Sequence, residues 1–276
     1  MKFGCFSLDF RRFSLETAFR MAARYGFDGI EIWGGRPHAY PYDMDAEETR
    51  KIRELKKAYG LEVPVYTPNA LGMPYNLFSL NERERRDAMD YFKTAIRACR
   101  QMEVPRMLMV ADHPGYETPR RESWQRFIDN MRELGEYARD HSVKLMIEAL
   151  TPVESPVITT ADDCLEAIRE IGLPNIEAMM DVVPPHIVCE PYSAYFEKLG
   201  GRMNYIHLCN NDGRTDAHLR LDTGELPVAD MLKVFRAYGF EGYVTVELYS
   251  ECYKDPELLL ANASRILGQI RRDLNV

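Results

Sequence analysis

The 276-residue sequence lacks the marks of several protein classes. No apolar run approaches the roughly 20 residues that cross a bilayer, and the first residues, MKFGCFSLDFRRF, lack the long apolar core of a signal peptide. The six cysteines form no CxxC pair, which argues against a zinc ribbon or a dithiol redox site. Basic residues are outnumbered, 35 against 43 acidic ones, and the net charge of −8 argues against a nucleic-acid-binding surface. We therefore expect a cytoplasmic protein with neither membrane nor nucleic-acid partners.

The sequence also lacks a linker that would mark a domain boundary, and no GxGxxG turn follows a predicted strand. It does contain a repeated pattern, in which a short aliphatic or β-branched run precedes a turn and an amphipathic helix. Eight such units favour parallel strands with right-handed crossovers. We therefore predict an α/β fold, a single (β/α)8 TIM barrel over residues 1–276. The predicted strands are 3–7, 29–34, 61–67, 106–111, 143–149, 176–182, 203–208 and 242–248.

Helix start signals support this alternation. Ser14, Asn81 and Thr160 are N-cap residue types that stand directly before helical patterns. Glu84 follows Asn81 by three residues, as in a capping box. An Asp-Pro pair at 255–256 is typical of the start of the last helix.

Polar side chains stand at the ends of the last four predicted strands. Glu148, Asp181, His207 and Glu247 come from successive strands at equivalent depth. One strand-end carboxylate alone is usually a surface residue or a helix cap, and one histidine alone is usually a core residue. Three carboxylates that converge would repel one another, and burial costs several kcal/mol per ion. A divalent cation resolves that repulsion, and Glu, Asp and His suit Mn²⁺, Co²⁺, Zn²⁺ or Fe²⁺.

Several motifs carry a family resemblance over nearly the whole chain. With them, the sequence resembles the xylose isomerase-like barrel superfamily, in the branch of ketose 3-epimerases, and within it the fructoselysine 3-epimerases. The motifs are DGIEIWGGRPHAY (28–40), YTPNALGMPYN (66–76), HPGYETP (113–119), EALTPVES (148–155), MMDV (179–182), YIHLCNNDG (205–213), RLDTGELP (220–227) and EGYVTVEL (241–248).

The resemblance implies a site and a reaction. Glu148, Asp181, His207 and Glu247 would hold one divalent metal, with Mn²⁺ favoured and Zn²⁺, Co²⁺, Fe²⁺ or Mg²⁺ also suitable. Glu148 and Glu247 would also act as the catalytic acid and base. They would move a proton at C3 of a ketose or fructosamine through a cis-enediolate, which the metal would stabilise. Glu154 would contact the sugar, and the protein would form a homodimer or homotetramer.

Two positions depart from the family pattern. The family places a histidine three residues after the metal-binding aspartate, where this sequence has Pro184, followed by His186. It places an arginine six residues after the metal-binding histidine, where this sequence has Gly213, followed by Arg214. We expect His186 and Arg214 to take over as substrate contacts. The departures argue against plain tagatose or psicose as the substrate.

Further candidate contacts follow the earlier strands. His113 could bind sugar hydroxyls, and Trp33 and Tyr66 could wall the sugar. Arg36 and His38 could bind the amino-acid carboxylate of a fructosamine, because arginine binds carboxylates through two hydrogen bonds. Each of these residues also has an ordinary interpretation as a loop or core residue.

Residues of the loop after the seventh strand have expected roles too. Asp212 and His218 are expected to orient the metal-binding residues from behind, whereas Asp216 is expected to be solvated.

Other functions stay open at this point. An aldose-ketose isomerase, a hydroxypyruvate isomerase or a C-glycoside-cleaving enzyme would share the four ligands. A DNA repair enzyme like endonuclease IV is disfavoured by the acidic composition and by only six histidines. A sugar-binding subunit without activity is the remaining alternative. No glycine-rich phosphate cradle is present, which favours an unphosphorylated sugar.

Overall fold

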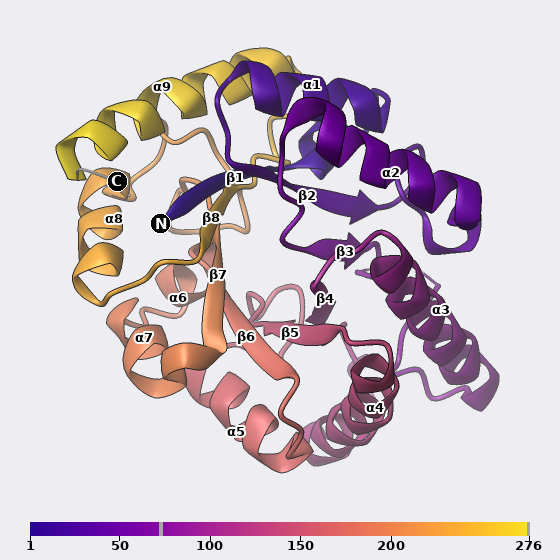
Figure 1. Ribbon diagram of the computed structural model, residues 1–276. Helices are drawn as coiled ribbons and strands as arrows, with labels where there is room; N and C mark the ends of the chain where they lie inside the picture. Colours follow the sequence, from indigo (N-terminus) through magenta and orange to yellow (C-terminus); the bar gives the residue numbers. More distant parts are fainter. Residues whose placement is uncertain (72–73, 275–276) are drawn as a thin grey trace.

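Eight parallel strands close into a barrel in the computed structural model, which describes residues 1–71 and 74–274 (Figure 1). Each strand pairs with its neighbour in the chain, and β1 pairs with β8. Residues 72–73, inside one of the family motifs, and residues 275–276 lie outside this description. The predicted (β/α)8 barrel is confirmed. The strands are β1 (Lys2–Phe6), β2 (Gly29–Gly34), β3 (Tyr66–Pro68), β4 (Arg106–Val110), β5 (Lys144–Glu148), β6 (Ile176–Asp181), β7 (Met203–Leu208) and β8 (Tyr243–Val246).

The helices surround the barrel (Figure 1). Within the described residues, no helix is both long and apolar enough to cross a membrane. The α-helices are α1 (Leu15–Arg24), α2 (Ala46–Tyr59), α3 (Glu82–Gln101), α4 (Arg120–Asp140), α5 (Ala161–Ile171), α6 (Val183–Ile187), α7 (Ser193–Leu199), α8 (Val228–Ala237) and α9 (Pro256–Leu274). Short 3-10 helices are η1 (Ser7–Phe10), η2 (Pro41–Asp43) and η3 (Gly200–Arg202).

The predicted helix starts are confirmed. Ser14 accepts a hydrogen bond from the Thr17 backbone N–H at the start of α1. At the start of α5, the hydroxyl of Thr160 and the carboxylate of Asp163 each bind the other's backbone N–H. Asn81 caps α3 by accepting a hydrogen bond from the Arg83 backbone N–H, but the capping box suggested with Glu84 does not form, because Glu84 binds the Asn81 side-chain amide and the Asn81 backbone N–H donates to Ser79. These caps satisfy donors that the first turn leaves unpaired, so each βα unit begins its helix at a defined residue.

The third strand is shorter than the predicted span of 61–67. Regular pairing begins only at Tyr66, although the backbone N–H groups of β2 already bond to the carbonyls of Glu62 and Val65. Pro64 lies between these two residues and has no N–H to donate, which interrupts the ladder.

The barrel interior changes from apolar to polar along each strand. Met146, Met179 and Tyr205 pack together with other side chains in a small apolar cluster inside the barrel. Inward-facing side chains recur every second residue along a strand. The next inward positions are Glu148, Asp181 and His207. The apolar cluster therefore closes the barrel beneath a polar layer at the carboxyl ends of the strands.

Candidate metal centre

Four buried side chains converge at the carboxyl ends of the last four strands. Glu148 ends β5, Asp181 ends β6, His207 lies near the end of β7, and Glu247 directly follows β8. One ligand atom from each lies within 4.8 Å of every other. Although the two glutamates come from strands three apart, a ligand oxygen of each lies within 4.8 Å of the other. The structure therefore brings together the four residues that the sequence predicted as ligands.

The imidazole of His207 is fixed from both sides. Its Nδ1 lies 3.1 Å from Glu148 Oε1 and 3.0 Å from Glu247 Oε2. Its Nε2 lies 2.8 Å from Oε2 of Glu31, a fully buried residue of β2. When Nε2–H donates to Glu31, the lone pair of Nδ1 points toward the two glutamates. This carboxylate–histidine arrangement sets the tautomer of a metal-binding histidine.

The sequence analysis did not propose Glu31 as a site residue. A signal was present, since Glu31 stands between Ile30 and Ile32 in a strand that is otherwise apolar. The Glu31 carboxylate also accepts hydrogen bonds from Tyr205 at 2.8 Å and Thr67 at 2.5 Å. A buried charge with three donors is positioned to orient His207.

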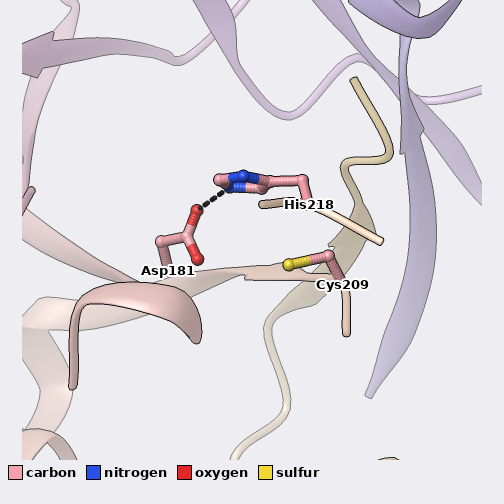
Figure 2. Close-up of side chains that lie close together, drawn as sticks. All are labelled: Asp181, Cys209 and His218. Carbon is pink, nitrogen blue, oxygen red and sulfur yellow. Dashed lines mark hydrogen bonds and ion pairs between the residues drawn. The ribbon is translucent and has the colours of Figure 1, made fainter. Parts of the chain in front are cut away.

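A second group overlaps the first at Asp181. His218 Nε2 lies 2.9 Å from Asp181 Oδ2 and 3.5 Å from Glu247 Oε2. Figure 2 shows this imidazole directed at the Asp181 carboxylate, with the sulfur of Cys209 close to both. Cys209 follows His207 by two residues and so faces the same side of the chain. Burial, together with the charge of Asp181, raises the pKa of this thiol.

Burial and like charges perturb the acids and bases of the cluster. Burial raises the pKa of Glu148 to about 8, and the charges of Asp181 and Glu247 act in the same direction. Burial alone would lower the pKa of His218, but Asp181 and Glu247 raise it to about 10. The pKa of His207 is likewise raised, by Glu31 and Glu247 against its burial. Protons on these groups therefore balance the buried negative charge, as a bound cation would.

A cavity of about 280 Å³ opens onto the cluster. Glu154 lines it and accepts hydrogen bonds from the backbone N–H and the hydroxyl of Thr151 at 3.1 and 3.0 Å. Asp216, which we expected to be solvated, is partly buried here and accepts a hydrogen bond from Tyr249. The expectation failed because the loop after β7 folds back, with Asn210 and Leu219 paired, over the barrel mouth. The lining is completed by Leu8, Asn69, Leu71, Glu148, Ala149, Leu150, Asp181, Pro184, His218, Glu247 and Tyr249.

The proposed substrate contacts from β2, β3 and the loop after β2 do not line this cavity. Tyr66 is fully buried and donates to the Ala39 carbonyl, so the prediction that it walls the sugar is wrong and it is a core residue. Arg36 is exposed and makes two hydrogen bonds to Asp43, at 2.6 and 2.7 Å. His38 is held by the Ser7 hydroxyl and the Phe13 carbonyl. Trp33 donates to Asn69, which does line the cavity.

His186 and Arg214, which we expected to replace the missing histidine and arginine of the family pattern, do not line the cavity. His186 lies 3.2 Å from Glu225, and Pro184 faces the cavity instead. Arg214 is exposed, and Asp212 is exposed too and caps the backbone of its own loop. The expectation that Asp212 supports the cluster is therefore wrong, whereas His218 does contact it.

His113 lines a neighbouring hollow of about 420 Å³. This hollow shares Leu71 and Glu154 with the first cavity, and Tyr116 forms part of its wall. A larger cavity of about 600 Å³ opens near the starts of β7 and β8, at the opposite end of the barrel. It contains none of the four converging residues, so we place the candidate site at the first cavity.

Comparison with known proteins assigns the family. The profile of the xylose isomerase-like TIM barrel family matches residues 19–270. This chain belongs to the xylose isomerase-like TIM barrel family. The fructoselysine 3-epimerase of Shigella flexneri is 38% identical over 263 residues, which span 95% of each protein. The probable ketose 3-epimerase of Synechocystis sp. is 24% identical over 96% of this chain and 89% of that protein.

Solved structures agree with the fold. A D-tagatose 3-epimerase-like protein superposes with a TM-score of 0.83 at 21% identity, over 100% of this chain and 98% of that chain. An L-ribulose 3-epimerase superposes with a TM-score of 0.82 at 19% identity, over 99% and 97% of the two chains. The names of the sequence relatives indicate a carbohydrate epimerase, as the sequence predicted.

Proposed function

We propose that this protein is a divalent-metal-dependent epimerase that acts at C3 of a ketose or fructosamine. The observation that carries the proposal is the convergence of Glu148, Asp181, His207 and Glu247 within 4.8 Å beneath an open cavity. The names of the relatives at 38% and 24% identity support the reaction.

The donor set fits a divalent metal. Three carboxylates and one imidazole are buried together, and Nδ1 of His207 is held toward the carboxylates. Oxygen and imidazole donors suit Mn²⁺, with Zn²⁺, Co²⁺, Fe²⁺ and Mg²⁺ as alternatives. When bound, the cation would act as a Lewis acid that stabilises negative charge on the oxygens of the substrate.

The two glutamates are placed to move the proton. One removes the weakly acidic proton at C3, next to the C2 carbonyl, and the other returns a proton to the opposite face of the carbon. The two carboxylates come from strands three apart in the barrel, and both line the cavity. In the metal-free protein, burial raises the pKa of Glu148 to about 8, and a bound cation would favour the ionised carboxylate, which is the form that accepts a proton.

The substrate is an unphosphorylated sugar in this proposal. In the described part of the chain, neither lysine nor arginine lines the cavity, so nothing there would pair with a phosphate. The cytoplasmic location and the homodimer or homotetramer stay predictions.

Isotope exchange tests the reaction. The manganese-loaded protein is incubated in D₂O with ketoses, fructosamines and sugar phosphates, and deuterium is located by NMR. We expect deuterium at C3 of a ketose or fructosamine, together with the C3 epimer and no migration of the carbonyl group. Formation of an aldose would indicate an isomerase instead. No exchange with any compound, in protein shown to hold metal, would refute the proposal and favour a binding role.

A further inference from the structure

A second group of metal-binding side chains lies beside the first cluster. Asp181, Cys209 and His218 each offer a ligand atom, and these atoms lie within 4.8 Å of one another. All three side chains are buried, and they come from β6, from the residue directly after β7, and from the loop that returns over the barrel mouth. In Figure 2 the imidazole and the sulfur are both directed toward the Asp181 carboxylate. Asp181 belongs to both groups, whereas Cys209 and His218 lie outside the first cluster.

The imidazole of His218 is oriented with Nε2 toward this group. Its Nδ1 lies 3.2 Å from the backbone carbonyl of Asp216, and a carbonyl only accepts, so Nδ1 carries a hydrogen. In the neutral ring Nε2 then has a lone pair, which faces Asp181 Oδ2 at 2.9 Å. A lone pair and a carboxylate repel each other unless a proton or a cation lies between them. A carbonyl behind the ring is a common way to fix the tautomer of a metal-binding histidine.

The thiol of Cys209 is fully buried and has no hydrogen-bond partner among the described residues. In contrast, the thiols of Cys99 and Cys252 donate to backbone carbonyls at 3.3 and 3.1 Å. The Cys209 sulfur instead lies beside a carboxylate oxygen and an imidazole nitrogen. A thiolate is a soft ligand that binds Zn²⁺ and related cations. An unpartnered sulfur directed at two other donor atoms therefore indicates a ligand position.

We propose that Asp181, Cys209 and His218 form a second metal site, which binds a thiophilic divalent cation such as Zn²⁺. Oxygen, sulfur and nitrogen donors together suit Zn²⁺ or Co²⁺, whereas the sulfur disfavours Mn²⁺ and Mg²⁺. When the cation binds, the thiol releases its proton to solvent and the thiolate becomes the ligand. Three protein ligands leave one position of a tetrahedral ion open for a water molecule. The proposed epimerase reaction does not use this second site.

Asp181 can serve both sites. A carboxylate offers two oxygens with about four lone pairs, so it can bridge two cations. A single divalent cation would leave one of the three buried negative charges of the first cluster uncompensated, and an uncompensated buried charge is costly. Two divalent cations would balance the negative charges of the three clustered carboxylates and the Cys209 thiolate, with both histidines neutral.

Cobalt binding tests the site through a signal that the first cluster cannot give. A cobalt ion bound to a thiolate has a sulfur-to-metal charge-transfer band in the near ultraviolet, and the first cluster has no sulfur. Titration of the metal-free protein with Co²⁺ should therefore produce this band, and metal analysis should find two ions per chain. Cys209→Ser should lose the band and keep one cobalt ion, which also shows that the variant is folded. Cys189→Ser alters the exposed thiol just after α6 and is the matched control, which should behave as the wild type.

Two further variants test the other ligands. His218→Gln should lower the affinity of the band-forming cobalt ion at least roughly tenfold, because even groups that only orient a ligand contribute that much. Asp181→Asn should weaken both cobalt ions, because it alters the shared carboxylate. A band that survives in Cys209→Ser, or a wild type that binds cobalt without the band, would overturn the second site.

Anomalous scattering locates the ions without any substitution. In crystals grown with Zn²⁺ we expect two peaks, one next to the Cys209 sulfur and the other among the four residues of the first cluster. A single peak at the first cluster would overturn the second site and leave the epimerase proposal intact. A single peak at Cys209 would support the second site and contradict the metal centre of the proposed epimerase.

Discussion

The two ends of strand β6 differ in the partners that they give a buried carboxylate. At its start, Glu177 is 5% exposed and pairs with Arg106 at 2.7 Å and Lys144 at 2.5 Å. At its end, Asp181 is also 5% exposed, but it lies among two further carboxylates with histidines as its basic partners. A buried charge is tolerated when it is paired. The first carboxylate is paired with two fixed cations, whereas the second has titratable histidines as partners and, in the proposed function, would also share a divalent cation.

The comparison separates structural from functional acids on one element. Arg106 and Lys144 begin β4 and β5, the two strands that precede β6 in the barrel, and reach across to Glu177. No described lysine or arginine makes an ion pair with Glu148, Asp181 or Glu247. The lack of lysine or arginine partners at the carboxyl ends of the strands therefore distinguishes the functional carboxylates from the structural one. Substitutions at both ends of the strands can test this distinction.

The strongest test removes a proton carrier at the carboxyl end. Glu148→Gln or Glu247→Gln should each lower kcat by roughly 10²–10⁴-fold, the contribution of a general acid or base. Exchange of deuterium at C3 and steady-state epimerisation measure the loss. Metal content and circular dichroism must first show that each variant is folded and loaded. Near-normal rates in both variants would contradict the two-glutamate scheme.

The next test lowers the affinity for the cation without changing a proposed ligand. Glu31→Gln removes the charge that holds Nε2 of His207. We expect manganese affinity to fall roughly 10–100-fold, as for other groups that orient a metal-binding histidine. Competition with a chelating dye measures the affinity. Glu62→Gln, which alters an exposed ion pair with Lys2 on the neighbouring segment, is the control and should leave the affinity unchanged. Equal manganese affinities in both variants would contradict a role for Glu31 in orienting His207.

Sequence reasoning recovered the barrel and the four converging residues because both follow from local patterns. Strands and helices alternate along the chain, and the last inward residue of a parallel strand must lie at the barrel mouth. Glu148, Asp181 and His207 were found by that rule. The apolar residues two positions before them confirm the inward direction.

What the sequence did not predict depends on contacts between distant segments. The burial of Asp216 follows from the return of the loop after β7, where it meets Tyr249. Tyr66 faces the core because its hydroxyl donates a hydrogen bond to a carbonyl of the loop after β2. Local spacing does not encode these long-range partners.

The acidity of the cluster gives a third test. Burial raises the pKa of Glu148 to about 8, so in the metal-free protein this carboxyl keeps its proton below that pH. Metal binding needs the carboxylate and must displace the proton, so affinity should rise with pH up to about 8. Loss of roughly tenfold in manganese affinity from pH 7 to pH 6 is expected for one displaced proton. A second displaced proton, from His207, would steepen the dependence. Calorimetry in buffers of different ionisation enthalpy counts the protons, and pH-independent binding would contradict this account.

The smallest expected effect is a difference in stability between substitutions at the two ends of the barrel. Glu177→Gln leaves Arg106 and Lys144 without their carboxylate, and since both cations are partly exposed we expect a loss of about 1–3 kcal/mol. Glu148→Gln should instead stabilise chelator-treated protein at pH 7, because the folded protein keeps the proton there whereas the unfolded carboxyl, with its ordinary pKa of 4.5, has lost it. The stability advantage of the Glu148→Gln variant should grow as the pH rises from about 4.5 to about 8 and should level off above that. Urea unfolding at pH 7 and pH 9 measures both variants. Equal losses at pH 7 would mean that the two carboxylates are paired alike, and the distinction between the ends of β6 would fail.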